Sequence, residues 1–174
     1  DQRALLRRLE WAAGRLDVKR IRHAVPAVGL NIASCIHGAF STDEVAAFPG
    51  RITMVDGALR HHETPAFGTS KHLASLLLAV HSQDESKVAA LNIRPPLRED
   101  GVDMDKIKQA CEQLGYTFGL APKGIVSGKN EKHDVLLDEG AFGWEPSLYI
   151  LAHNPLELVD RTHQIVGVLG GASA

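Results

Sequence analysis

The spacing of apolar residues along the chain predicts both helices and strands. Apolar side chains recur every three or four residues in four segments, which is the pattern of a helix with one buried face. These segments are residues 2–16, 70–80, 103–114 and 155–169. Shorter apolar runs bounded by glycine, proline or polar residues predict strands. These runs are residues 28–36, 88–94, 116–120, 134–137 and 147–152. Because strands and helices do not alternate strictly, we expect an α/β fold with a mixed sheet covered by helices.

Turn and capping residues refine this pattern. An Asp-Gly pair separates two short β-type runs, 51–55 and 58–62, and predicts a hairpin with a type I′ turn. The Ser-Thr-Asp-Glu sequence that begins at Ser41 has the form of a capping box and predicts a short helix to about Ala47. The polar segment 121–132 predicts a mobile loop.

The composition is that of an ordinary globular domain. The chain has 174 residues, 44% of them hydrophobic and 23% charged, which suits one domain with a substantial core. A net charge of −2 provides no basic field, so we expect no direct binding of nucleic acid. Two cysteines and the lack of a membrane-length apolar run favour a cytoplasmic protein. Because the chain begins at Asp1, we expect residues 1–24 to be an N-terminal helix and linker from a larger chain, and residues 25–174 to be the functional domain.

One stretch combines the features of an anion site. Pro49 and Gly50 form a turn that delivers Arg51 to a strand, and a later Gly-Thr-Ser step leads into a helix with Lys71 and His72 in its first turn. Helix N-termini present free N–H groups and partial positive charge, so they attract phosphate. We interpret this stretch as a phosphate or diphosphate site on which Arg51 and His72 act. The alternative is an ordinary loop, because many glycine turns before helices bind nothing.

Other polar residues could join this site. Arg94 ends a predicted strand, and the segment 138–146 is a loop rich in carboxylates and glycine between two strands. Ligands of α/β folds gather at such strand ends. Asn31 interrupts an apolar strand; a buried, hydrogen-bonded amide is the favoured interpretation, and a ligand contact is the alternative. Trp144 belongs either to the core or, within its glycine loop, to a stacking surface for a flat ring.

The signatures of several other chemistries are absent from the sequence. The histidines show no spacing typical of zinc ligands, so we expect no structural zinc. There is no P-loop, no dinucleotide-binding glycine motif and no nucleophile elbow. Ser70 and His72 are too close in sequence to be interpreted as a hydrolase pair.

Several short motifs together resemble a known family. In order they are Gly-Leu-Asn-Ile at 29–32, Asp-Glu-Val-Ala at 43–46, Phe-Pro-Gly-Arg-Ile at 48–52, Phe-Gly-Thr-Ser-Lys-His-Leu-Ala at 67–74, Asn-Ile-Arg at 92–94, and a glycine loop from Asp-Glu-Gly to Glu-Pro at 138–146. This series is similar to the archaeal-type thiamine-phosphate synthase domain, and the resemblance covers nearly the whole chain from Val28 onward. Such domains are usually fused behind a hydroxymethylpyrimidine-phosphate kinase, and in some archaea behind a helix-turn-helix domain.

The resemblance implies a fold and a reaction. The fold is a three-layer α/β/α arrangement with a mixed sheet, akin to that of class II aldolases. In the reaction, the nitrogen of a thiazole phosphate displaces diphosphate from hydroxymethylpyrimidine diphosphate and gives thiamine phosphate. Arg51 and His72 are the catalytic pair that the family pattern implies. The wider substrate-binding set is Asn31, Gly68, Thr69, Ser70, Lys71, Asn92, Arg94, Asp138, Gly140, Trp144 and Glu145.

The chemistry of these residues suits the implied reaction. Arg51 and Arg94 can bind diphosphate in a bidentate manner, and the N-terminus of the following helix adds fixed donors. His72 can donate a proton or a hydrogen bond to the leaving group. The flat aminopyrimidine needs an amide or carboxylate partner, for which Asn31 and Glu145 are candidates.

The resemblance also implies which small molecules and domains accompany the chain. The expected partners are the phosphorylated pyrimidine and thiazole substrates and a fused upstream domain. The resemblance is compatible with a homodimer, and we expect no association with a membrane. We expect no tightly bound cofactor. Mg²⁺ could accompany the diphosphate, and Asp138 could organise that ion or an arginine.

The chain departs from the family pattern at a few positions. Ala141 stands where the glycine loop usually has a second aspartate, Tyr149 stands near a place that usually holds an arginine, and Thr69 and Lys71 replace smaller residues. These changes leave open a second hypothesis, a sensor domain that binds thiamine phosphate without turnover. A third hypothesis, a relative of sugar-phosphate aldolases, is disfavoured because the sequence has no histidine metal triad.

Overall fold

A mixed seven-stranded sheet lies at the centre of the protein. The computed structural model describes residues 1–126 and 131–171. The strand order is β5-β2-β1-β6-β11-β10-β9, and all neighbours are antiparallel except β10 and β9. The strands are β1 (Ile32–Cys35), β2 (Val45–Ala47), β5 (Ala66–Phe67), β6 (Ala89–Ile93), β9 (Phe118–Leu120), β10 (Val135–Asp138) and β11 (Ser147–Ala152). Two small hairpins lie outside the sheet, β3 (Ile52–Val55) with β4 (Ala58–His61) and β7 (Leu97–Arg98) with β8 (Gly101–Val102).

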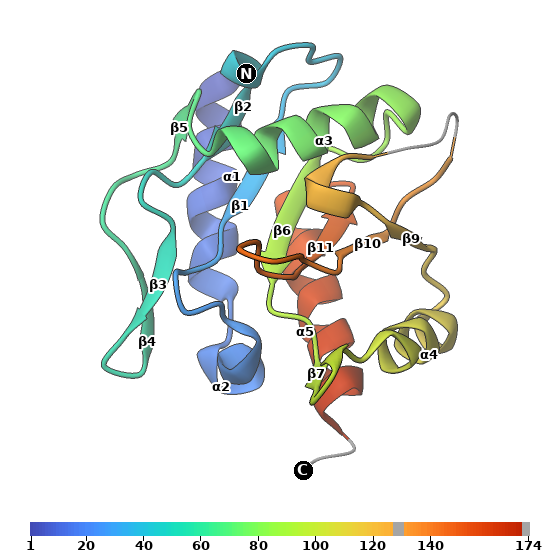
Figure 1. The fold of residues 1–174 in the computed structure, drawn as a ribbon. Helices are drawn as coiled ribbons and strands as arrows, with labels where there is room; N and C mark the ends of the chain where they lie inside the picture. Colours follow the sequence, from blue (N-terminus) through green and yellow to red (C-terminus); the bar gives the residue numbers. More distant parts are fainter. Residues whose placement is uncertain (127–130, 172–174) are drawn as a thin grey trace.

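Helices cover both faces of the sheet and make three layers, as Figure 1 shows. The helices are α1 (Gln2–Arg15), α2 (Val18–Ile21), α3 (Lys71–Gln83), α4 (Met104–Leu114) and α5 (Pro155–Gly171), with 3-10 turns η1 (Arg22–Ala24), η2 (Thr42–Glu44) and η3 (Pro122–Gly124). On one face, α3 packs on the sheet through residues such as Leu73 and Leu77. On the other face, α1, α4 and α5 bury a separate apolar cluster. None of the helices in the described ranges is long and apolar enough to cross a membrane.

The N-terminal helix is part of this core. Leu9 and Ala12 of α1 are fully buried, and the helix packs beside α5. Asp1 caps α1 by accepting a hydrogen bond from the backbone N–H of Arg3 (3.0 Å). Residues 1–24 therefore fold together with the sheet, whereas their origin in a larger chain stays a prediction.

Most turns and helix caps in the structure are those that the sequence predicts. The residues between β3 and β4, Asp56 and Gly57, have φ angles of 51° and 79°, as the predicted type I′ turn requires. Asp103 and Asn154 each accept a hydrogen bond from a backbone N–H in the first turn of α4 or α5. These elements depend on residues close in sequence, which is why the local pattern predicts them correctly.

The predicted helix at 41–47 is wrong beyond its first turn. The capping box at Ser41 is present, but it initiates only the 3-10 turn η2. Val45, Ala46 and Ala47 are fully buried and form strand β2, because pairing with β1 and β5 outweighs the local helix signal. The predicted strand at 28–36 is also shorter, since regular pairing begins at Ile32. Within the predicted loop 121–132, η3 forms a turn, and residues 127–130 lie outside the described part of the chain.

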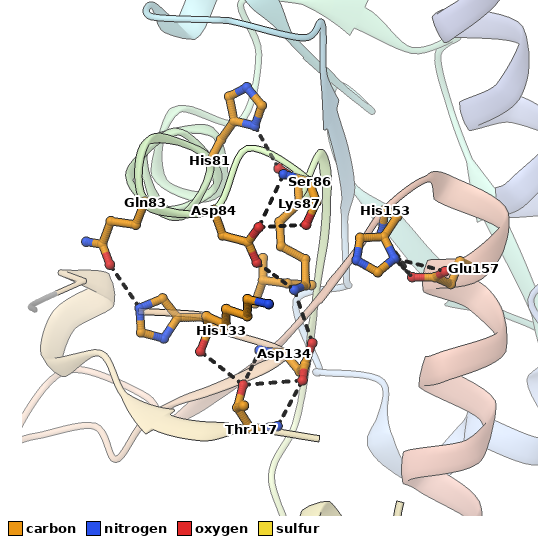
Figure 2. A network of polar contacts seen from close by, with 12 residues as sticks. His81, Gln83, Asp84, Ser86, Lys87, Thr117, His133, Asp134, His153 and Glu157 are labelled. Atoms are coloured by element: carbon orange, nitrogen blue, oxygen red, sulfur yellow. Dashed lines mark hydrogen bonds and ion pairs between the residues drawn. The ribbon is translucent and has the colours of Figure 1, made fainter. Parts of the chain in front are cut away.

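A buried ion-pair network joins the elements at one end of the sheet (Figure 2). The ammonium group of Lys87 lies 2.9 Å from Asp84 after α3 and 3.2 Å from Asp134 before β10. Arg161 of α5 lies 2.9 Å from the same Asp134 carboxylate and 3.2 Å from Glu157. These residues lie where α3 ends and where β6 and β10 begin. The network is therefore at the opposite end of these elements from the first turn of α3 with its His72.

Candidate functional site

The entry to α3 is a tight turn fixed by a threonine. Gly68 and Ser70 have φ angles of 78° and 50°, which turn the chain sharply into the helix. The Thr69 hydroxyl donates to the carbonyl oxygens of Ala47 (3.2 Å) and Ala66 (3.3 Å) and so anchors the turn to the sheet. Ser70 occupies the N-cap position but makes no side-chain capping hydrogen bond. The first-turn N–H groups of α3 can therefore serve a ligand, because a helix leaves them without partners of its own.

Arg51 occupies a strained backbone position. Its φ angle is 68°, in the left-handed region that favours glycine, and Gly50 before it has a φ of 76°. The predicted placement of Arg51 on a strand is therefore wrong, because β3 begins only at Ile52. The guanidinium group is exposed, and within residues 1–126 and 131–171 it donates a single, long hydrogen bond of 3.5 Å to the carbonyl oxygen of Val28. Strain of this kind gathers at ligand-binding sites, where the surrounding structure holds it in place.

Two adjoining cavities meet at a shared wall that contains Arg51, Ser70 and His72. The first, of about 210 Å³, has an aromatic and amide lining. Its own polar and aromatic side chains are Asn92, Trp144, Glu145, Ser147 and Tyr149. The second, of about 490 Å³, is formed by the two turns that precede β3 and α3. Its own lining residues are Phe48, Pro49, Gly50, Thr69 and Lys71.

His72 lies between these cavities and is held on several sides. Its Nε2 atom lies 3.0 Å from the hydroxyl oxygen of Tyr149. The ring of Trp144 meets the imidazole edge-on, with 5.7 Å between the ring centroids. The backbone of Gly124 closes a third side, because a Cβ atom at that position would lie 2.5 Å from the imidazole Cε1 atom. The structure therefore brings together two predicted residues, His72 and Trp144, and adds the contacts of Tyr149 and Gly124 with His72, which sequence patterns do not reveal.

The glycine loop 139–146 is organised by Asp138 itself. This carboxylate is buried and accepts hydrogen bonds from the indole N–H of Trp144 (2.6 Å) and the backbone N–H of Gly140 (2.9 Å). Gly140 has a φ of 77°, and a Cβ atom there would lie 2.6 Å from the carbonyl oxygen of Trp144. No arginine in the described ranges forms an ion pair with Asp138. Asp138 thus positions Trp144 beside His72, and its role toward Mg²⁺ stays a prediction.

The two asparagines both line the first cavity, and Asn31 also lines the second, but their amides have different roles. The amide of Asn31 is buried, donates to the carbonyl oxygen of Phe48 (2.9 Å) and accepts from the backbone N–H groups of Phe48 (3.0 Å) and Ile32 (2.9 Å). This geometry agrees with the favoured interpretation of a satisfied amide, which here holds the turn before Arg51. Asn92 accepts from the backbone N–H of Asn31 (2.8 Å) and lines the first cavity.

Arg94 does not lie with Arg51, contrary to the prediction. It lines a separate pocket together with His23 and Lys106, around the last turn of α5. Because β6 ends at Ile93, the Arg94 N–H turns away and donates to the carbonyl oxygen of Ala24 (2.7 Å). Cations beside the C-terminus of a helix interact favourably with its dipole, which accounts for this cluster.

Comparison with known proteins decides the family. The model of the family described as thiamine-phosphate synthase ThiN matches residues 8–164. The chain belongs to this family. A thiamine-phosphate synthase ThiN of Methanothermobacter thermautotrophicus is 24% identical over 162 residues, which cover 82% of this chain and 81% of the relative.

Solved structures confirm the expected fold of this ThiN chain. The C-terminal domain of a phosphomethylpyrimidine kinase has a TM-score of 0.79 and 20% identity, and the match covers 95% of this chain and 100% of that one. A sugar-phosphate aldolase from Thermotoga maritima has a TM-score of 0.58 and 10% identity, with 99% and 96% covered. The aldolase-like α/β/α architecture is thus shown. Among the described residues of the ThiN chain, however, no group of three or more histidine, cysteine or acidic side chains is arranged to hold a metal ion.

The departures from the ThiN pattern differ in whether they contact the candidate site. Ala141 is exposed at the outer part of its loop, pairs through its backbone with Trp144 and lines neither cavity. Tyr149, in contrast, lines the first cavity and contacts His72. Sequence patterns could not identify this contact, because 77 positions separate the two residues.

Replacing Gly124 by alanine is expected to lower the rate of the reaction at the His72 site by about 10-fold or more. The reason is that the new methyl group would displace the His72 ring. The control is Gly115→Ala. Gly115 has a φ of 77°, close to the 76° of Gly124, but a Cβ atom there would meet nothing within 4 Å. Both variants should lose about 1 kcal/mol of stability from left-handed strain, measured by urea unfolding. A rate loss of equal size in both variants would contradict the role of the His72 contact.

Proposed function

We propose that this ThiN chain is a thiamine-phosphate synthase that joins hydroxymethylpyrimidine diphosphate to hydroxyethylthiazole phosphate and releases diphosphate. The observation that carries the proposal is the placement of Arg51 and His72 on the wall shared by two cavities of different chemistry. A reaction between a flat ring and a phosphorylated partner needs an aromatic compartment and an anion compartment side by side. The family membership of the chain supports the same reaction.

The second cavity suits phosphate groups. It contains Lys71, the guanidinium of Arg51 and the first turn of α3, whose N–H groups point outward from the helix. An arginine binds phosphate oxygens through a planar fork of N–H groups, and a helix N-terminus adds fixed partial charge. These groups come from the two turns that precede β3 and α3, so an anion there would join the two segments.

The first cavity suits a flat heterocycle. Trp144 is 39% exposed, which leaves part of its indole surface open to a ligand, while its indole N–H stays bound to Asp138. Asn92 and Glu145 supply an amide and a carboxylate at the same cavity, the groups that an aminopyrimidine edge would pair with. Aromatic contact with a few placed polar groups is the usual composition of a small-molecule site.

The chemical step is a substitution at the methylene carbon of the pyrimidine. The carbon–oxygen bond to diphosphate breaks, the diphosphate leaves with the electron pair, and the thiazole nitrogen forms the new carbon–nitrogen bond. Negative charge grows on the leaving oxygen, where Arg51 can stabilise it and His72 can donate a hydrogen bond or a proton. We assign Mg²⁺, where present, to the phosphate oxygens of the substrate. A cytoplasmic location and a fused upstream kinase remain part of the proposal, supported by the family's biosynthetic role and by the similar kinase C-terminal domain.

The test is direct synthesis. Purified protein is incubated with both phosphorylated substrates and Mg²⁺, and thiamine phosphate is measured by chromatography. We expect product to form in amounts proportional to protein, together with equimolar diphosphate. Folded protein that makes no product would overturn the proposal. Calorimetry with thiamine phosphate on the same sample then tests the sensor hypothesis, which requires tight binding without turnover.

A further inference from the structure

Tyr149 is a buried residue on an inner strand of the sheet. Tyr149 lies on β11, between β6 and β10 in the sheet, and its backbone is in register with Asn92 and Leu136. Its side chain is only 3% exposed. The hydroxyl oxygen lies 3.0 Å from Nε2 of His72, which comes from a different layer of the fold. A group fixed in this way can orient the side chain that it contacts.

Two further groups contact the His72 ring. Trp144, itself bound to Asp138, meets the imidazole from one side, and Gly124 approaches it from another. Nε2 is engaged by Tyr149, and Nδ1 has no hydrogen-bond partner among residues 1–126 and 131–171. Because His72 lines both cavities, Nδ1 is the nitrogen left for a ligand.

A tyrosine hydroxyl can donate or accept a hydrogen bond, so the role that it takes toward Nε2 decides whether Nδ1 carries a proton. Burial raises the pKa of Tyr149 and outweighs a hydrogen bond with the Ser147 side chain, which lowers it, while the charge of Asp138 adds to the rise; the hydroxyl therefore keeps its proton at neutral pH. When it donates to Nε2 of a neutral imidazole, the imidazole proton lies on Nδ1; when it accepts from Nε2–H of a neutral imidazole, Nδ1 carries no proton. Toward a protonated imidazole it accepts from Nε2, and Nδ1 carries a proton. An Nδ1–H donor is therefore present in the protonated imidazole and in the neutral imidazole to which Tyr149 donates.

We propose that Tyr149 is a positioning residue whose hydroxyl holds His72 in the form that presents Nδ1–H to the leaving oxygen of the substrate. The part of this inference that concerns the leaving oxygen rests on the proposed synthase function. The part that concerns the imidazole is a property of the free protein, so it can be tested without substrate.

The first test is the ¹⁵N spectrum of histidine-labelled full chain, in which the two neutral tautomers of imidazole give different nitrogen shifts. His72→Gln identifies the His72 signals by their loss. We expect wild-type protein with a neutral His72 imidazole to show the Nδ1–H form, and Tyr149→Phe to show a population shifted toward Nε2–H. A wild-type Nε2–H form, or an unchanged spectrum in Tyr149→Phe, would overturn the inference. If Tyr149→Phe does not fold, the wild-type spectrum alone decides.

The second test is kinetic and uses the other tyrosine as its control. Tyr116 donates its hydroxyl to Gln164, outside both cavities, so Tyr116→Phe removes the same atom at a different place. We expect Tyr149→Phe to lower kcat about 10-fold with both KM values within about twofold, and Tyr116→Phe to change neither. A change in KM alone, or an equal loss of kcat in both variants, would overturn the positioning role. Wild-type protein without turnover would overturn the proposed function and leave the spectrum to judge Tyr149.

Discussion

Replacing either Arg51 or His72 by alanine is expected to lower kcat/KM for thiamine-phosphate formation by about 100-fold or more. Both side chains lie on the wall shared by the two cavities, where charge on the leaving diphosphate would develop. The Arg51→Ala substitution removes a delocalised cation with a planar fork of N–H donors. The His72→Ala substitution removes the hydrogen-bond or proton donor. The rates are measured with both substrates varied, so that effects on kcat and KM are separated.

Two matched controls accompany these variants. Arg60 and His62 are exposed on or next to the hairpin strand β4 and line neither cavity. Arg60→Ala and His62→Ala should keep wild-type rates. Losses of similar size in all four variants would show that the assay responds to general charge or folding, and would contradict the assigned roles.

The backbone at Arg51 allows a sharper version of the experiment. Because its φ of 68° favours glycine, Arg51→Gly removes the side chain and relieves strain in the same step. We expect this variant to lose as much activity as Arg51→Ala while its free energy of unfolding stays equal or rises. This result would show that the native arginine lowers the stability of the fold but is needed for activity, so that its strained backbone position serves ligand binding.

Local signals account for the parts of the fold that the sequence predicts well. The Asp-Gly turn, the Asp103 and Asn154 caps and the helix periodicities depend on residues within one or two turns of each other. The helix predicted for the residues of strand β2 is wrong for the opposite reason. Its residues follow a genuine capping box, and only pairing with β1 and β5, which are distant in sequence, makes them extended.

The candidate site shows the same difference between local signals and contacts that join residues distant in sequence. Arg51, Ser70 and His72 are found by motifs, because each turn is encoded next to the residue that it presents. Arg94 is misplaced because its position at a strand end says nothing of the direction in which the chain then turns, here toward Ala24. Tyr149 and Gly124 are missed because their importance lies in a contact with His72 across the fold.

Replacing Lys87 by methionine is expected to destabilise the protein by about 3 kcal/mol at pH 7. The lysine side chain is 4% exposed, and the two carboxylates that it joins, Asp84 and Asp134, are 10% and 15% exposed. Methionine keeps the apolar stem but leaves these carboxylates without their shared cation. Urea unfolding measures the loss. The activity per folded molecule should remain that of the wild type, since the network lies at the opposite end of α3 from His72.

The pH dependence of this loss tests its electrostatic origin. Burial alone raises the pKa of Asp84, but hydrogen bonds from Ser86 and Lys87 and the charge of Lys87 outweigh it and lower the pKa to about 2. The stabilisation from this carboxylate is therefore complete above about pH 4 and is lost as the pH falls toward 2. The difference between wild type and Lys87→Met should narrow over the same range. The exposed Lys108→Met variant should differ from wild type by less than about 0.5 kcal/mol throughout. A Lys87→Met deficit that is unchanged between pH 7 and 2 would assign the loss to packing instead of charge.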